Sequence, residues 1–198
     1  MADNPWALYQ RHPAFVLGFH GTEQSTVDAA VAGNHLKSSA GRFEWLGHGV
    51  YFWENDPQRG LEWAKNGNPK NPIKQPDVVG AVIDLGLCLD LTTRTGLDEV
   101  ARAHDILLDV YREEGIPPPQ NDGGEDKFKR ELDCQVIQTL HQYRNENNLP
   151  AYDSVRAPFP EGHELYDGAG FRLNNHIQIA VTNIACIKGY FRPMQNDE

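Results

Sequence analysis

The sequence predicts one domain of the mixed α+β class. Apolar runs of strand length lie near both ends of the chain, and two longer helical segments lie between them. The chain has 198 residues, of which 39% are hydrophobic, and it contains no internal repeat, so its size suits a single domain with a genuine core. Because strands and helices do not alternate regularly, the pattern argues against a doubly wound parallel sheet.

The N-terminal part of the chain predicts a strand followed closely by a helix. Residues 14–19 (AFVLGF) form a short apolar run that is typical of a strand, and this strand is expected to end at His20. Ser25 or Thr26 is then expected to cap a helix that ends at Gly33.

A second strand and a second helix follow a loop of small and polar residues. Residues 49–53 (GVYFW) predict the strand. Asp56 and Pro57 supply an N-cap and a proline at the first helical position, which predicts a short helix through Lys65. Residues 66–76 are rich in Asn and Pro and predict a loop.

The remainder of the chain predicts further strands on either side of the helical middle. Residues 78–91 predict one strand or two, interrupted at Gly86. Two helices are expected at about 96–114 and about 125–147, separated by a segment rich in proline and glycine. The last quarter predicts strands at 152–159, 176–181 and 186–191, with a long glycine-containing loop over 158–175.

Composition and charge limit the possible functions. The chain has 28 acidic and 18 basic residues, a net charge of -10, which argues against a protein that holds nucleic acid mainly through its phosphates. No apolar run approaches the roughly 18 residues of a membrane span, and the first residues lack the features of a signal peptide, so a cytoplasmic protein is expected. The cysteines are far apart in apolar surroundings and are expected to be buried thiols: Cys88, Cys134 and Cys186.

Several familiar signatures are absent from the sequence. There is no complete GxGxxG, no GxxxxGK[ST], no HExxH and no Cys/His set with zinc spacing, so we expect no metal site and no site of the common nucleotide-binding types. Arg156 is expected either to form a surface ion pair or to bind a diphosphate or a carboxylate of a target.

Three short motifs occur at or near the predicted strand ends. His20-Gly21-Thr22 follows the first strand, Tyr51 lies within GHGVYF, and Gln178 lies in HIQIAV. Together they resemble the ADP-ribosyltransferase superfamily, especially its poly(ADP-ribose) polymerase-like branch, whose His-Gly-Ser/Thr, Gly-x-Gly-hydrophobic-Tyr-Phe and late-strand glutamate form a His-Tyr-Glu triad. The resemblance covers residues 15–65 and 171–191. It implies a split β-sheet of the ADP-ribosyltransferase type, with about 96–147 as a helical insertion.

The resemblance also implies roles for individual residues toward NAD. His20 would bond a ribose hydroxyl, and the backbone of Gly21 would pair with the nicotinamide carboxamide, with Thr22 completing that motif. Tyr51 would stack on the nicotinamide ring and Trp63 would close its other face.

Gln178 takes the triad position that a glutamate holds in the family, so the resemblance implies a His-Tyr-Gln variant. Glutamine keeps a hydrogen bond to the ribose but lacks the charge that offsets a developing cation. His176, on the same strand face, is the competing register. Glu161 or Glu164 in the preceding loop is an alternative source of the carboxylate, and Gly60 or a neighbour stands where the family often has a serine for the carboxamide.

The activity implied is mono-ADP-ribosyl transfer, because family members without the glutamate tend to transfer single units. NAD would be the substrate, and the acceptor would be a macromolecule, either protein or nucleic acid, chosen by the loop 161–175. Because an unregulated enzyme of this kind would be hazardous to the cell, a partner that neutralises it is also expected. Two alternatives stay open: a toxin-like NAD glycohydrolase, and a degenerate module that binds NAD without chemistry.

Overall fold

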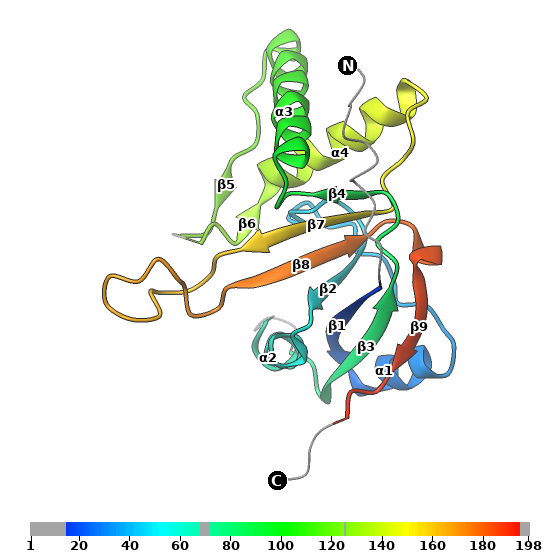
Figure 1. Ribbon diagram of the computed structural model, residues 1–198. Helices are drawn as coiled ribbons and strands as arrows, with labels where there is room; N and C mark the ends of the chain where they lie inside the picture. The colour runs from blue at the N-terminus through cyan, green and yellow to red at the C-terminus, as the bar shows by residue number, and fades with distance from the viewer. Residues whose placement is uncertain (1–14, 68–71, 125, 195–198) are drawn as a thin grey trace.

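A seven-stranded mixed sheet forms the centre of the protein (Figure 1). The structure is a computed structural model that describes residues 15–67, 72–124 and 126–194. The strands of the sheet are β1 (Val16–Glu23), β2 (Val50–Glu54), β3 (Pro76–Ile83), β4 (Cys88–Asp90), β7 (Ser154–Phe159), β8 (His176–Val181) and β9 (Ile187–Phe191). The other elements are the helices α1 (Gln24–Val31), α2 (Pro57–Asn66), α3 (Arg94–Glu114) and α4 (Glu131–Glu146), a hairpin of β5 (Asn121–Asp122) and β6 (Lys129–Arg130), and a 3₁₀ turn, η2 (Ile184–Cys186). The predicted mixed α+β class is confirmed.

The strand order in the sheet is β4-β7-β8-β2-β1-β3-β9. The pair β4–β7 is parallel and the other described pairs of this sheet are antiparallel. Strand β1 pairs with β3 along its whole length, whereas it pairs with β2 only at Gly18↔Glu54 and Phe19↔Trp53. The two central strands therefore part beyond Phe19.

The helices cover different parts of the sheet. Helices α3 and α4 lie together at the β4–β7 end, and α1 and α2 lie near β1, β3 and β9 (Figure 1). Side chains of β2 alternate between the two sides: Val50 and Phe52 enter one core and Tyr51 packs against the other, as the strand period of two requires.

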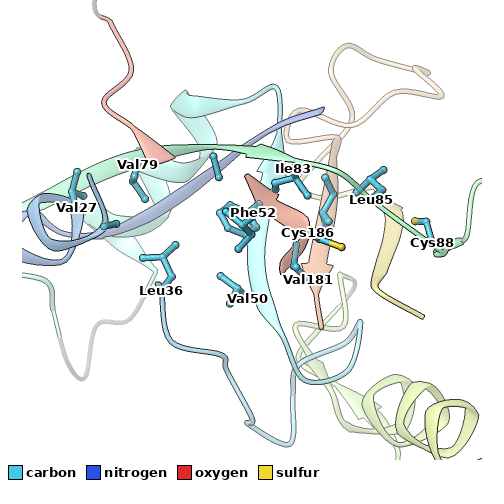
Figure 2. Packing of buried hydrophobic residues seen from close by; sticks show 14 residues of the cluster. Val27, Leu36, Val50, Phe52, Val79, Ile83, Leu85, Cys88, Val181 and Cys186 are labelled. Atoms are coloured by element: carbon cyan, nitrogen blue, oxygen red, sulfur yellow. The ribbon is translucent and has the colours of Figure 1, made fainter. Parts of the chain in front are cut away.

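The first core lies between the sheet and α1 (Figure 2). Phe52 is fully buried, among aliphatic residues from α1, β3 and β8 and the thiol of Cys186 in the turn before β9. Its labelled members in Figure 2 are Val27, Leu36, Val50, Phe52, Val79, Ile83, Leu85, Cys88, Val181 and Cys186.

The second core joins the middle helices to the sheet. Ala103 and Leu107 of α3 and Ile137 and Leu140 of α4 pack with residues of β4, β7 and β8, including Val155. The helices predicted as an insertion therefore share a hydrophobic core with the sheet, and their removal would expose β4, β7 and β8 to water.

Two boundaries near the N-terminus differ from the prediction. Strand β1 continues through Glu23, so His20 lies inside it and not after its end, because β3 continues to pair with it as far as Pro76. The prediction that Ser25 or Thr26 caps α1 is wrong: the helix begins at Gln24 directly after extended Glu23, without a side-chain cap. The predicted strand residue Ala14 lies outside the described residues.

The start of α4 also differs from the prediction. The helix begins at Glu131 and not near 125, because the chain first forms the β5–β6 hairpin, whose turn contains Gly123 and Gly124 at positive φ. The side-chain amide of Asn121 donates to Asp133 at 2.8 Å and ties the hairpin to the first turn of α4. Residue 125 itself lies outside the described residues.

Other predictions are confirmed. The interruption at Gly86 separates β3 from β4, and Gly86 has a φ of 58°, which glycine tolerates best. Asp56 caps α2 by accepting from the backbone N–H of Arg59, with Pro57 at the first helical position. The three cysteines are free and buried, and β8 spans the predicted residues. No helix in the described ranges is long and apolar enough to span a bilayer.

Arg156 forms an ion-pair cluster inside the sheet. Its guanidinium donates from β7 to Glu54 of β2 at 2.6 and 3.0 Å, and to Asp90 of β4 at 3.1 Å. The three side chains are 10 to 14% exposed, so this is a largely buried cluster and not the surface pair that the sequence suggested. It links three strands, and removal of one partner would leave a buried charge uncompensated.

Gly21→Ala is expected to destabilise the protein. A Cβ at this position would lie 1.8 Å from the carbonyl oxygen of Gly60, so α2 would have to move away from β1. Overpacking of this kind costs about 1 to 3 kcal/mol, and each kcal/mol lowers the Tm of a domain of this size by about 2 to 4 °C. Thermal unfolding measures the effect.

Gly189→Ala in β9 is the matched control, because a Cβ there meets no atom within 4 Å. Its Tm should stay near that of the wild type. Equal melting of both variants would contradict the close contact between β1 and α2.

Candidate functional site

A pocket of about 640 Å³ lies where β1 and β2 part. Its walls come from β1, β2, β8, helix α2, the segment before β2, the β5–β6 hairpin and the end of β7. The lining residues are His20, Lys37, Ser39, Glu44, Trp45, Gly49, Tyr51, Trp53, Arg59, Glu62, Trp63, Asn66, Gly67, Phe128, Arg130, Phe159, Glu161 and Gln178. The three predicted triad residues therefore lie in one pocket.

His20 spans the gap between the two central strands. Its Nδ1 donates to the backbone carbonyl of Tyr51 at 2.8 Å, which leaves Nε2 without a proton in the neutral ring. Burial lowers the pKa of His20, and the hydrogen bond to the Tyr51 carbonyl opposes this only in part. The imidazole is therefore neutral at pH 7 and has Nε2 as an acceptor for a hydroxyl group.

Tyr51 is fixed by the segment before β2. Its hydroxyl donates to the carbonyl of Gly47 at 2.8 Å and accepts from the backbone N–H of Leu46 at 2.9 Å. Burial raises the pKa of Tyr51, and the charge of Glu44 raises it further, so the side chain is a neutral phenol. The hydroxyl is engaged in structure, and the aromatic ring is the part of Tyr51 that a ligand can use.

Gln178 lies opposite Trp53 in the β2–β8 register. Its Oε1 accepts from the indole N–H of Trp45 at 2.7 Å, which fixes the orientation of the amide. Because Oε1 is the acceptor in this bond, the amide nitrogen is the atom that Gln178 can offer as a donor to a ligand.

Trp63 forms an aromatic wall of the pocket with Trp53. The two ring centroids are 6.0 Å apart, and Trp63 remains 43% exposed. A large exposed aromatic side chain on the rim of a pocket is suited to stacking on a planar ligand, which would bury its open face.

Arg59 links two carboxylates of the pocket. One Nη nitrogen donates to both oxygens of Glu161 at 3.0 Å each, and the other donates to Glu62 at 3.1 Å. The side chains of Arg59 and Glu161 are 18% and 16% exposed. The ion pair holds α2 against the segment that follows β7.

The other predicted site residues lie outside the pocket lining. Gly21 is buried and packs against Gly60 of α2, and Thr22 pairs with Asp77 of β3. Glu164 is exposed and accepts from the backbone N–H of Gly168. The close packing of Gly60 on β1 accounts for a glycine at that position.

His176 also lies outside the lining, although it shares a strand face with Gln178. Its side chain is 1% exposed, and its ring centroid is 5.1 Å from that of Phe159 and 6.4 Å from that of Trp53. The imidazole therefore supports the pocket wall from behind. Burial lowers its pKa, and its Nδ1 donates to the carbonyl of Asn174 at 2.7 Å.

Sequence reasoning missed Trp45, Arg59 and Arg130 as site residues. Arg130 lies over the ring of Phe159 at 4.2 Å and over that of Trp45 at 4.9 Å, so it closes the pocket wall at the β5–β6 hairpin. One signal was present: Trp45, with Phe43 and Leu46, is a large apolar residue in a predicted loop that is otherwise rich in small and polar residues.

Comparisons with protein-family models, with curated proteins and with solved structures found no match. Within the ranges that the structure describes, no group of three or more His, Cys, Asp or Glu side chains is placed to hold a metal ion. The chemical capacity of the site follows from its own residues: a neutral histidine acceptor, a fixed tyrosine ring, an oriented amide and a paired carboxylate.

The lowered pKa of His20 makes stability depend on pH. The unfolded chain binds a proton at this histidine near pH 6.5, whereas the folded protein binds it only at lower pH. Its contribution to stability is therefore complete above pH 6.5 and is lost as the pH falls through the lowered pKa. The Tm of wild type should fall between pH 7 and pH 5.

His20→Gln should reduce this pH dependence, because glutamine binds no proton. Wild type and variant are compared by thermal unfolding at several pH values. Since His141 and His176 also have pKa values lowered by burial, some dependence should persist in the variant. Identical slopes for the two proteins would contradict a lowered pKa at the partly buried His20.

Proposed function

We propose that this protein is a mono-ADP-ribosyltransferase that cleaves the nicotinamide–ribose bond of NAD and transfers ADP-ribose to a macromolecule. One observation carries the proposal: His20, Tyr51 and Gln178, from three different strands, line one pocket together with Trp63. Their order along the chain and the motifs around them resemble those of the ADP-ribosyltransferase superfamily. The parting of β1 from β2 supports a split sheet of that type.

The pocket chemistry supports NAD as the substrate. In this proposal a planar nicotinamide ring stacks on the fixed ring of Tyr51 and on the exposed ring of Trp63, which both line the pocket, a contact worth about 0.5 to 1.5 kcal/mol beyond the area that it buries. The neutral Nε2 of His20 suits a ribose hydroxyl. When the bond between ribose C1′ and the nicotinamide nitrogen breaks, both electrons go to nicotinamide and a cation develops on the ribose, as in glycoside hydrolysis.

The loop between β7 and β8 supports a protein acceptor. It projects beyond the start of β8 (Figure 1) and carries four exposed large hydrophobic side chains, those of Leu165, Tyr166, Phe171 and Leu173. Apolar side chains suit a protein surface better than a phosphate backbone, and the net charge of -10 agrees with this. The three free thiols suit a reducing cytoplasm. The proposal includes a neutralising partner because the activity would be hazardous to the cell if it were unregulated.

Two alternatives predict different products. A glycohydrolase would pass ADP-ribose to water, and a binding module would leave NAD intact. We would incubate the protein with NAD labelled on the adenylate, alone and with cell lysate separated into protein and nucleic acid fractions. Label fixed to one fraction, and lost with His20→Ala, supports transfer; free ADP-ribose without an acceptor supports hydrolysis; unchanged NAD contradicts both activities.

Tyr51→Ala is expected to abolish NAD binding, because it removes the stacking surface. The measurement is thermal stabilisation by NAD. Tyr51→Phe is the matched variant: it keeps the ring and loses the bonds to Leu46 and Gly47, so binding should weaken by no more than about tenfold. NAD-induced stabilisation that survives in Tyr51→Ala would rule out the stacking role.

Gln178→Glu is expected to increase NAD cleavage by about tenfold or more, since about 1.4 kcal/mol of charge stabilisation corresponds to that factor. The introduced carboxylate would keep its hydrogen bond from Trp45 and would add a negative charge beside the ribose. The kcat for nicotinamide release is the measured quantity. An unchanged kcat would place Gln178 away from the reacting carbon.

A further inference from the structure

A short turn before β2 bonds two of the three residues of the proposed triad. Residues 44–47 form the turn, which is closed by a backbone hydrogen bond of 2.7 Å between its last and first residues. Its backbone groups bond the hydroxyl of Tyr51, and the side chain of Trp45 bonds Gln178. One segment of the chain therefore connects β2 with β8 at the pocket.

The hydrogen bond between Trp45 and Gln178 has only one possible direction. An indole nitrogen can donate but cannot accept, so the amide atom that lies 2.7 Å from it must be the oxygen Oε1. The amide nitrogen of Gln178 has no hydrogen-bond partner among the residues that the structure describes, and Gln178 lines the pocket. The donor end of the amide is therefore available to a ligand.

Trp45 is itself held by its neighbours. Its ring centroid is 5.0 Å from that of Phe159, and the guanidinium of Arg130 lies over both rings, at 4.9 and 4.2 Å. Arg130 in turn donates to the carbonyls of Asp126 and Lys127 at 3.2 Å each. The indole cannot turn away from Gln178 without losing its contacts with both an aromatic ring and a cation.

A fixed donor at Gln178 complements the acceptor at His20. The neutral His20 offers Nε2 to a hydroxyl proton, whereas Gln178 offers N–H groups to a hydroxyl oxygen, and the hydroxyl groups of a ribose can meet both needs. The positive end of an N–H dipole gives no stabilisation to a developing cation. The amide of Gln178 is therefore suited to binding the ribose in the ground state and the transition state alike.

We propose that Trp45 is the positioning residue of Gln178: it turns the amide nitrogen toward the pocket, where the amide donates to a ribose hydroxyl of NAD. The inference rests on the proposed function, because NAD supplies the ribose. Trp45 acts through Gln178, and the pair contributes to the affinity for NAD and not to the breaking of the bond between nicotinamide and ribose.

Trp45→Phe tests the inference, because it removes the indole N–H and keeps an aromatic ring beside Phe159 and Arg130. The apparent Kd of NAD from thermal stabilisation and the KM for NAD should both rise by about 2- to 10-fold, the effect of one hydrogen bond. The kcat should stay unchanged, as for an interaction made equally in the ground state and the transition state. Phe43→Leu is the control from the same segment, since Phe43 is exposed outside the pocket lining, and it should keep the wild-type KM.

Trp45→Phe in the Gln178→Glu background separates positioning from packing. A carboxylate has two equivalent oxygens, so either orientation presents the same group to the ribose, and the change in KM should be less than about twofold. An equal rise of KM in both backgrounds would make Trp45 only a packing residue and overturns the inference. An unchanged Kd in Trp45→Phe alone overturns it as well.

NMR tests the hydrogen bond itself without a Trp45 variant. The indole N–H of Trp45 should exchange slowly with solvent in the wild type and faster in Gln178→Ala, because that variant removes its acceptor. Equal exchange rates in the two proteins overturn the inference.

The inference and the proposed function fail in different ways. If NAD stabilises the wild type but is not cleaved, the proposed function fails, and the Kd values still decide the role of Trp45. If wild type cleaves NAD and Trp45→Phe binds it with wild-type affinity, only the inference is overturned. If NAD neither stabilises the wild type nor is cleaved, both are overturned.

Discussion

The parting of β1 from β2 beyond Phe19 and Trp53 is the constraint on which the rest of the site depends. Strand β1 continues to Glu23 because β3 pairs with it that far, and α2 packs closely against it at Gly21 and Gly60. Because β3 satisfies the backbone hydrogen-bonding groups on one edge of β1, only the other edge has unpaired groups where β1 separates from β2. His20 bridges the gap through its hydrogen bond to the carbonyl of Tyr51.

Two arginines show how position decides the role of an ion pair. Arg156 and Arg59 each contact two carboxylates, and each reaches a partner 102 positions away in the chain. Arg156 lies within the sheet, where Glu54 and Asp90 compensate its charge, and it is not part of the pocket lining; its effect is on strand assembly. Arg59 has a similar number of partners but lines the pocket, so its ion pairs shape the site that a ligand would enter.

The sequence could predict those features that depend on neighbouring residues. Alternation in HIQIAV defined β8, and Asp56-Pro57 defined the start of α2, because both signals are local. The extent of β1 depends on pairing with β3, and the start of α4 depends on the bond from Asn121 to Asp133, so neither could be predicted. Likewise, the contact of Trp45 with Gln178 joins residues 133 positions apart.

The anchored hydroxyl of Tyr51 has a consequence for the thermodynamics of recognition. Because Leu46 and Gly47 hold the phenol from both sides, its torsion angles are set before any ligand arrives. Ordering a free side chain at an interface costs about 0.5 to 1.5 kcal/mol, and this protein meets that cost during folding. The pocket is preorganised, so a planar ligand gains the stacking contact without first having to immobilise its partner.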